Sequence, residues 1–258
     1  MPDYSLIDLP HILQMVFYPR DEYTPCPKNS FDIAVPMEDG VEVFTRFYMK
    51  DLKQPSILYF HGNGEVIYDY DDVAPLYNAL GVNLIVADYR GYGSSGGYPT
   101  FTDVCKDAKV IFNVVKGELA QREYSGKLWL MGRSLGSLSA LEIAFHYQDK
   151  IEGLILESGF SNVARLINNF FGLPENFPVQ QFDQDCLDML KSITLPALIL
   201  HGDMDHIVPY KEGLYIHENL SSTEKKMITI SNAGHNDIMY MGMKKKQYFE
   251  PIKDFIFR

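Results

Sequence analysis

Three cysteines occur among the 258 residues, and they are widely separated along the chain. The C-x-x-C spacing that zinc sites and redox pairs use is missing, so the sequence predicts neither a metal nor a cofactor. Sparse, unpaired cysteines are typical of a reducing compartment, and we therefore expect a cytoplasmic location.

Basic residues and long apolar runs are also scarce. Lys and Arg number 23 against 34 Asp and Glu, which gives a formal net charge of −11. Nucleic-acid binders need clustered positive charge, so we expect no nucleic-acid partner. No stretch approaches the roughly 18 apolar residues that a membrane span requires, and no secretory signal pattern is visible at the N-terminus. The sequence does not indicate an oligomeric state.

The composition that remains is that of a globular protein, with 46% hydrophobic and 22% charged residues. A chain of this length can form one domain, which we expect over residues 1–258. Residues 1–30 contain several prolines and few periodic apolar positions, apart from an apolar patch near residues 12–17. This segment is expected to be an arm that lies on the domain.

The apolar pattern predicts an α/β fold. Two alternating segments, 31–35 and 41–48, flank the turn dipeptide Asp39-Gly40 and indicate a β-hairpin. Short, continuously apolar runs separated by helical stretches follow, at 57–60, 84–87, 128–131, 154–156, 197–200 and 227–230. Strands buried on both faces have this appearance. We expect an eight-stranded, mostly parallel sheet with an antiparallel N-terminal hairpin and helices on both faces.

Polar, glycine-rich loops follow five of these six runs. The loops read HGNG at 61–64, DYRGYG at 88–93, GRSLG at 132–136, HGDMD at 201–205 and AGHN at 233–236. In open α/β sheets, ligands bind beyond the carboxyl ends of the strands. The sequence therefore concentrates candidate chemistry at one edge of the sheet.

The segment 132–136 is a G-x-S-x-G turn between an apolar strand and a helical stretch, the context that a nucleophilic serine requires. Such a turn is so sharp that side chains at Gly132 and Gly136 would clash, and it holds Ser134 in a strained conformation. The alternative is a strand-to-helix turn without chemistry. We expect Ser134 to be a nucleophile.

A serine hydroxyl needs a general base, and seven histidines are available. His235 lies in a loop after the last predicted strand, which matches the chain order Ser, acid, His. His61 and His201 stand at strand ends directly before glycine, where a histidine commonly braces a loop. We expect His235 to be the base.

Two acids, Asp203 and Asp205, compete for the role of orienting that histidine. Asp205 precedes an apolar turn that leads into the next helix, whereas Asp203 is placed to accept backbone N–H bonds within its loop. We favour Asp205, whose carboxylate would select the tautomer of His235 and stabilise its imidazolium. Asp203 remains an alternative.

The oxyanion formed during acyl transfer needs donors fixed in advance. We expect the backbone N–H groups of Leu135, directly after the nucleophile, and of Asn63, in the loop 61–64. Gly64 is a weaker alternative to Asn63 in that loop. A glycine-rich turn required only by backbone geometry is the other interpretation of this loop.

Taken together, HGNG, DYRGYGSSGG, GRSLGS, GDMDHIVP and GHND closely resemble the α/β-hydrolase superfamily, from about residue 31 to the C-terminus. Within it the chain looks like the small single-domain serine hydrolases related to depalmitoylases. The resemblance implies the triad Ser134, Asp205 and His235, and Arg90 as an ion-pair partner. Depalmitoylases of this kind carry a cysteine-rich N-terminus, whereas residues 1–30 contain only Cys26.

The segment 159–194 is expected to form a short helical cap. Its aromatic residues Phe160, Phe170 and Phe171 would line an apolar acyl pocket, or would only pack the cap onto the domain. We expect hydrolysis of a small-molecule acyl ester or thioester through an acyl-serine intermediate. The alternatives are a small peptidase or amidase with the same triad, and a catalytically silent binding protein on the same scaffold.

Overall fold

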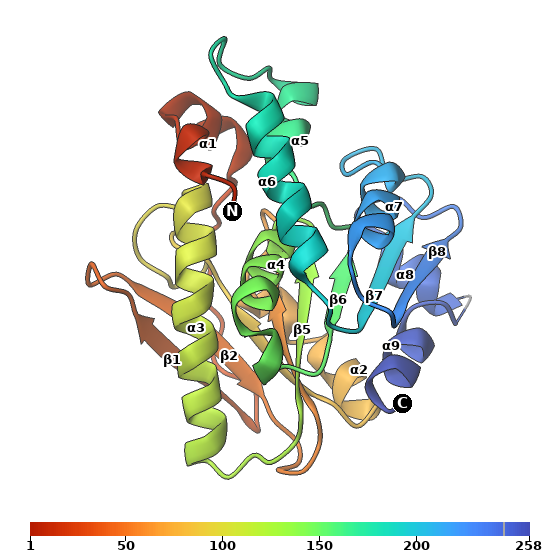
Figure 1. Cartoon of the computed structure of the whole chain (residues 1–258). Coiled ribbons are helices and arrows are strands. Elements are labelled where there is room, and N and C mark those ends of the chain that lie inside the picture. Colours follow the sequence, from red (N-terminus) through yellow and green to blue (C-terminus); the bar gives the residue numbers. More distant parts are fainter. Residues whose placement is uncertain (245) are drawn as a thin grey trace.

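A computed structural model describes residues 1–244 and 246–258, and across them the chain builds one sheet of eight strands (Figure 1). The order across the sheet is β1-β2-β4-β3-β5-β6-β7-β8. Strands β1 and β2 form the predicted antiparallel hairpin, and β3 to β8 run parallel. The strand bounds are Ser30–Pro36, Glu42–Tyr48, Ser56–Phe60, Asn83–Ala87, Leu128–Arg133, Leu154–Glu157, Ala197–Gly202 and Lys225–Ile230. The predicted fold class is confirmed.

The neighbour of the hairpin is β4 rather than β3, with Phe47 opposite Ile85. The chain leaves β3, passes through α2 and returns in β4, which lies between β2 and β3. Parallel neighbours need a crossover connection, and a crossover can return on either side of a strand. Apolar runs in a sequence carry no information about that choice.

Helices cover both faces of the sheet. Figure 1 shows α3, α4 and α6 as one layer in front of it, while α2 and α9 lie on the other face. Strand β5 shows how side chains alternate between these layers, because Trp129 packs edge-on against Phe255 of α9 while Gly132 faces Ala140 of α4. The helix bounds, from α1 to α9, are Pro10–Val16, Ala74–Ala79, Phe101–Gln121, Gly136–Tyr147, Val163–Phe170, Val179–Ser192, Tyr210–Asn219, Ile238–Lys244 and Phe249–Ile256.

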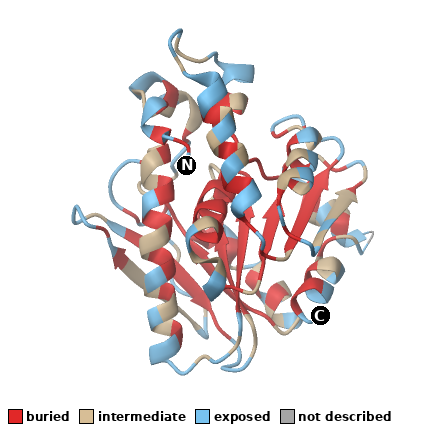
Figure 2. Cartoon of the chain, in the orientation of Figure 1, coloured by how far each residue is buried: buried red, intermediate tan, exposed pale blue. Residues whose placement is uncertain are grey.

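The core lies on the two faces of the central strands. Figure 2 shows these strands buried along their length, with exposed residues gathered on the outer sides of the helices. Every residue of β3, β4 and β5 is buried. Burial on both faces explains why these segments are continuously apolar in the sequence instead of alternating.

The N-terminal arm contains a helix, α1, that the sequence did not predict. It begins with Pro10 at its first position, where the missing N–H costs nothing, and seven residues are too few for apolar periodicity to indicate a helix. The Asp8 carboxylate anchors the arm, since it accepts hydrogen bonds from the backbone N–H groups of Phe101 (2.7 Å) and Thr102 (3.2 Å) at the start of α3.

Two helices, α5 and α6, occupy most of the segment 159–194. Figure 1 shows them with α1 above the carboxyl ends of the parallel strands, and the ring of Tyr4 in the arm packs edge-on against Phe182 of α6. Within residues 1–244 and 246–258, no helix combines the length and the apolar character needed to cross a membrane.

Two helical glycines offer a matched test of this packing. We expect Gly136→Ala to lower the free energy of unfolding by at least about 1–3 kcal/mol, because the added methyl group would clash with the carbonyl of Phe60. Gly117→Ala, on the exposed side of α3 with no atom within 4 Å of the added Cβ, should raise it by roughly 0.5–1 kcal/mol. Urea or thermal denaturation measures both. Equal effects of the two substitutions would contradict the close approach of α4 to β3.

Candidate active site

The turn between β5 and α4 has the strained geometry expected of a nucleophile turn. Ser134 has a φ of +50°, a left-handed conformation that costs a non-glycine residue about 1–3 kcal/mol. A Cβ at Gly132 would clash with the backbone of Gly136, and a Cβ at Gly136 would clash with Phe60. Glycine at both positions therefore lets the strand and the helix approach closely enough to hold Ser134 in this conformation.

Ser134, His235 and Asp205 come from three different loops and meet in one hydrogen-bonded series. The Nε2 atom of His235 lies 2.9 Å from the Ser134 Oγ, and its Nδ1 atom lies 2.7 Å from the Asp205 Oδ2. All three residues are buried. An ionised carboxylate is only an acceptor, so Nδ1 carries the proton, and Nε2 is left to accept the hydroxyl hydrogen of Ser134.

The carboxylate of Asp205 is held in its ionised form by its surroundings. Its Oδ1 accepts hydrogen bonds from the backbone N–H groups of Ile207 (3.0 Å) and Val208 (2.8 Å). Burial by itself raises the pKa of this carboxyl, but contacts with His201 and His235 and the bond from Val208 outweigh burial and hold the pKa well below its usual range. A fixed negative charge therefore faces the Nδ1 atom of His235.

Asp203 lies in the same loop but does not occupy this position. Its Oδ1 accepts a hydrogen bond from the backbone N–H of Asn232 (2.6 Å) and so joins the loop after β7 to the turn after β8. The structure thus brings Asp205, and not Asp203, to the histidine. Asp203 is two positions before Asp205 in an irregular loop, and its side chain points to the turn after β8 instead of to His235.

The other two histidines at strand ends brace their loops. The His61 ring lies between the Gly62 carbonyl (2.8 Å) and the Asp88 carboxylate (2.9 Å), and it is completely buried. The His201 ring donates from Nε2 to the Val208 carbonyl (2.9 Å). Neither of them is hydrogen-bonded to Ser134.

Two backbone N–H groups next to Ser134 are available to a ligand. Among the hydrogen bonds of residues 1–244 and 246–258, the N–H groups of Asn63 and Leu135 have no acceptor, and both residues line the same cavity as Ser134. The N–H of Gly64 also has no acceptor among these hydrogen bonds, but Gly64 does not line the cavity, whereas Asn63 does. The lining thus favours Asn63 over Gly64 as the second donor.

The side chain of Asn63 attaches the N-terminal arm to the site, which the sequence did not indicate. Its Oδ1 accepts hydrogen bonds from the Tyr18 N–H (3.0 Å) and the Tyr92 hydroxyl (2.5 Å), and its Nδ2 donates to the Val16 carbonyl. The apolar patch near residues 12–17 was the only signal, and it does not show where the arm lies.

A cavity of about 390 Å³ opens above Ser134. Its walls are mostly apolar and come from the arm, the start of α3, helix α5 and the loop after β7. Phe160 is buried in it, whereas Phe170 and Phe171 are exposed at its edge. The apolar lining consists of Met15, Val16, Tyr18, Phe101, Leu135, Phe160, Val163, Leu166, Ile167, Phe170, Phe171, Ile207 and Val208.

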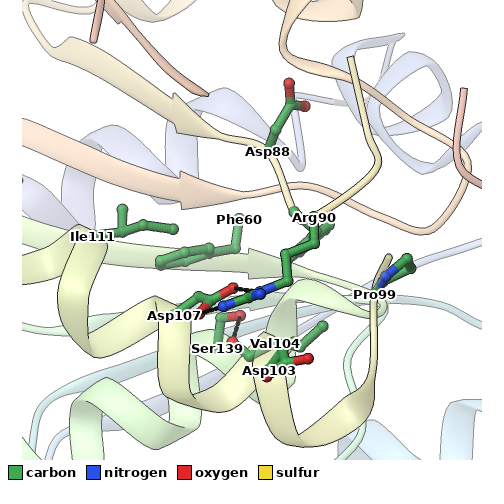
Figure 3. A pocket seen from close by; sticks show the side chains of 10 residues that line it. Phe60, Asp88, Arg90, Pro99, Asp103, Val104, Asp107, Ile111 and Ser139 are labelled. Carbon is green, nitrogen blue, oxygen red and sulfur yellow. Dashed lines mark hydrogen bonds and ion pairs between the residues drawn. The ribbon is translucent and has the colours of Figure 1, made fainter. Parts of the chain in front are cut away.

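Arg90 belongs to a structural ion pair away from this cavity. Figure 3 shows its side chain directed at Asp107 of α3, whereas Asp88, two residues earlier, points the other way. The Nε and Nη2 atoms lie 2.7 and 3.0 Å from the two Asp107 oxygens, and Nη1 lies 2.5 Å from Asp39. This arrangement joins the loop after β4 to α3 and to the turn of the hairpin.

No cluster of three or more His, Cys, Asp or Glu side chains suited to holding a metal occurs in the part of the chain that the structure describes. The polar groups at the cavity include a hydroxyl, an imidazole with its carboxylate behind it, and backbone N–H donors, with Arg133 and Asn236 beside them. This set is suited to nucleophilic acyl transfer.

Comparison with known proteins agrees with the fold. Residues 53–177 match the family model described as "Serine aminopeptidase, S33". The uncharacterized membrane protein YNL320W of Saccharomyces cerevisiae is 30% identical over 70% of this chain. Alpha/beta hydrolase domain-containing protein 17B of Homo sapiens is 27% identical over 78% of it. The matched regions cover 62% and 66% of these two relatives, less than two thirds of either.

The esterase Pf2001 of Pyrococcus furiosus superposes with a TM-score of 0.73 at 19% sequence identity, over 93% of this chain and 98% of the esterase. At 19% sequence identity, this superposition shows that the two proteins share a fold. Together with the sheet order and the nucleophile turn, these matches show that the chain belongs to the α/β-hydrolase superfamily.

The depressed pKa of Asp205 leads to a prediction about acid stability. Asp205→Asn should lower the free energy of unfolding at pH 7, and by less at pH 3. The ionised carboxylate contributes stability above its unfolded-state pKa of about 3.9, and this contribution is lost as the pH falls. Asparagine does not titrate, so the difference between the two proteins in urea denaturation should narrow on acidification. If the difference in free energy of unfolding between the two proteins stays constant or widens as the pH falls, the prediction is wrong.

Proposed function

We propose that the protein is a serine hydrolase that cleaves a carboxylic ester or thioester through an acyl-Ser134 intermediate. The observation that carries the proposal is the hydrogen-bonded series from Ser134 through His235 to Asp205 at the base of an apolar cavity. Such a cavity provides apolar surface for an acyl chain, and buried apolar surface is worth roughly 25 cal/mol per Å².

In the proposed reaction the Ser134 Oγ attacks the substrate carbonyl carbon while the Nε2 of His235 takes the hydroxyl proton. The carbonyl oxygen becomes an oxyanion that accepts hydrogen bonds from the N–H groups of Asn63 and Leu135, each worth roughly 3 kcal/mol in the transition state. Collapse expels the alcohol or thiol, which takes the proton from His235. Water then attacks the acyl group by the same route and releases the acid and free Ser134.

Asp205 keeps its negative charge throughout these steps. It orients the imidazole of His235 and stabilises the imidazolium without taking the proton. Its depressed pKa supports this role, because a carboxylate that stays ionised can stabilise the positive charge each time the histidine takes a proton.

A peptidase or amidase is the second candidate, favoured by the match to the family model described as "Serine aminopeptidase, S33". An aminopeptidase must bind the ammonium group of its substrate, and a carboxylate usually serves this purpose. Among the described residues that line the cavity there is no Asp or Glu. This lining supports ester or thioester cleavage over peptide cleavage, and it suits a small acyl substrate.

We further propose that residues 1–258 act as one domain, in which the arm 1–30 and the cap 159–194 enclose the acyl pocket. Residues from both segments, among them Met15 and Phe160, line the cavity. A cytoplasmic location remains a prediction, and one of the relatives is named a membrane protein.

A fluorophosphonate probe should label the wild-type protein and should not label Ser134→Ala. Hydrolysis of p-nitrophenyl esters should fall by at least about 10⁴-fold in the same variant, because removing the nucleophile removes the acyl-enzyme route. Asp205→Asn should lose about 10⁴-fold in kcat, whereas Asp203→Asn, the matched control, should stay within about tenfold of wild type. Labelling of Ser134→Ala would sink the proposal, and an unlabelled, inactive wild type would favour the silent binding protein.

The size of the pocket should appear in the dependence of activity on acyl-chain length. Each methylene that enters the cavity should raise kcat/KM by up to about fourfold, until the cavity is full. Met15→Trp should move the optimum to shorter chains, because Met15 lines the cavity. Gln14→Trp, on the exposed side of the same helix, should leave the optimum where it is. Identical profiles for the two variants would show that the arm does not bound the acyl pocket.

A further inference from the structure

The side chain of Arg133 spans the two halves of the candidate site. Arg133 directly precedes Ser134 at the end of β5, and its Nη2 donates to the main-chain carbonyl of His235 (2.9 Å) and to the Asn236 Oδ1 (3.1 Å). The side chain is only 9% exposed. One residue therefore begins beside the nucleophile and ends on the loop that carries the base.

The same guanidinium group also reaches two carboxylates. Its Nη1 lies 2.6 Å from the Glu65 Oε1, and its Nε donates to the Glu157 Oε1 at 3.2 Å. Glu65 in turn accepts a hydrogen bond from the N–H of Gly62 (2.7 Å) and so holds the loop that carries Asn63. Burial raises the pKa of Glu65, but the charge of Arg133, together with His61 and the bonds from Gly62 and Tyr70, outweighs burial and the net pKa is lowered.

Arginine suits this position better than any other residue type. Its planar group offers five N–H donors in a fixed arrangement; three of them donate to Glu157, His235 and Asn236, while Nη1 forms an ion pair with Glu65. Lysine would supply the positive charge but not the planar arrangement of several N–H donors. A Cβ at Gly62 would clash with the Nη1 of Arg133, so the guanidinium packs directly against the backbone of the 61–64 loop.

Independent support comes from the space behind the loop that carries His235. A second cavity of about 390 Å³ lies there, lined by Arg133, Glu157, Asn236, Met239 and Tyr248 among others. A loop backed by a cavity receives little van der Waals support on that side. Hydrogen bonds from Arg133 replace this support.

We propose that Arg133 is a positioning residue that holds the His235 loop in register with Ser134 and the Asn63 loop, and thereby sets the geometry of proton transfer. The proposal rests on the proposed function. Arg133 also lines the cavity above Ser134, but three of its donors are held by Glu157, His235 and Asn236 and its Nη1 is paired with Glu65, so we expect it to position the loops rather than bind the substrate. Its loss should therefore lower kcat and leave KM nearly unchanged, since a misplacement of about 1 Å can cost about 10²-fold in rate.

The test compares Arg133→Ala, Arg133→Lys and Asn236→Ala with wild type, after circular dichroism and thermal denaturation have shown which variants are folded. We expect Arg133→Ala to lose about 10²-fold in kcat and Arg133→Lys to remain impaired. The milder Asn236→Ala removes a single acceptor and should lose less. It keeps the test possible if the arginine variants do not fold. Arg90→Ala, which removes another paired and largely buried arginine side chain away from the site, should lower stability and leave kcat and KM near wild type.

Guanidinium chloride at concentrations that do not change the fold should partly restore kcat to Arg133→Ala, because the cavity behind the loop admits it. Sodium chloride at equal ionic strength should not restore kcat, and neither should urea. Wild-type kcat in a folded Arg133→Ala, or a loss confined to KM, would overturn the proposal. A wild type that neither hydrolyses esters nor reacts with fluorophosphonate would instead overturn the proposed function, so the two failures are distinguishable.

Discussion

The close approach of α4 to strands β3 and β5 is the constraint on which the rest of the site depends. Glycine at 132 and 136 lets the helix backbone reach the carbonyl of Phe60, a distance that no other residue at these positions would allow. This approach forces the left-handed conformation of Ser134 and lifts its hydroxyl clear of the sheet. It also places the N–H of Leu135 at the start of α4, where the positive end of the helix dipole favours a developing negative charge.

The other groups of the site arrive because parallel strands end at one edge. The loops after β3, β5, β7 and β8 all emerge there; they bring Asn63, Ser134 and His235 to a single cavity and place Asp205 behind His235. Loops of this kind do not keep their shape by themselves, since few apolar contacts hold them. Buried polar contacts do so instead, most of all those of Arg133, which joins three of the loops.

Electrostatics in the site divide between the two sides of Arg133. On one side lies an apolar cavity with a single ionised carboxylate, that of Asp205, behind the histidine. On the other side lies a cavity with mixed polar and apolar walls, where Glu157 is buried and burial raises the pKa of its carboxyl. Arg133 lines both cavities and pairs with Glu157 and Glu65 on that side.

The sequence by itself determined the α/β fold and the placement of Ser134, Asn63, Leu135 and His235 in loops at strand ends. Both follow from local patterns: apolar runs report strands buried on two faces, and glycine spacing reports a turn too tight for side chains. The sequence favoured Asp205 over Asp203 only by its neighbours, and contact with His235 was decided by the way the loop after β7 bends. Three features came from tertiary structure alone: the place of β4 beside the hairpin, the arm that Asn63 attaches to the pocket, and the reach of Arg133 across the site. Each joins residues far apart in the chain, and such contacts depend on how the whole chain packs rather than on any pattern within one segment.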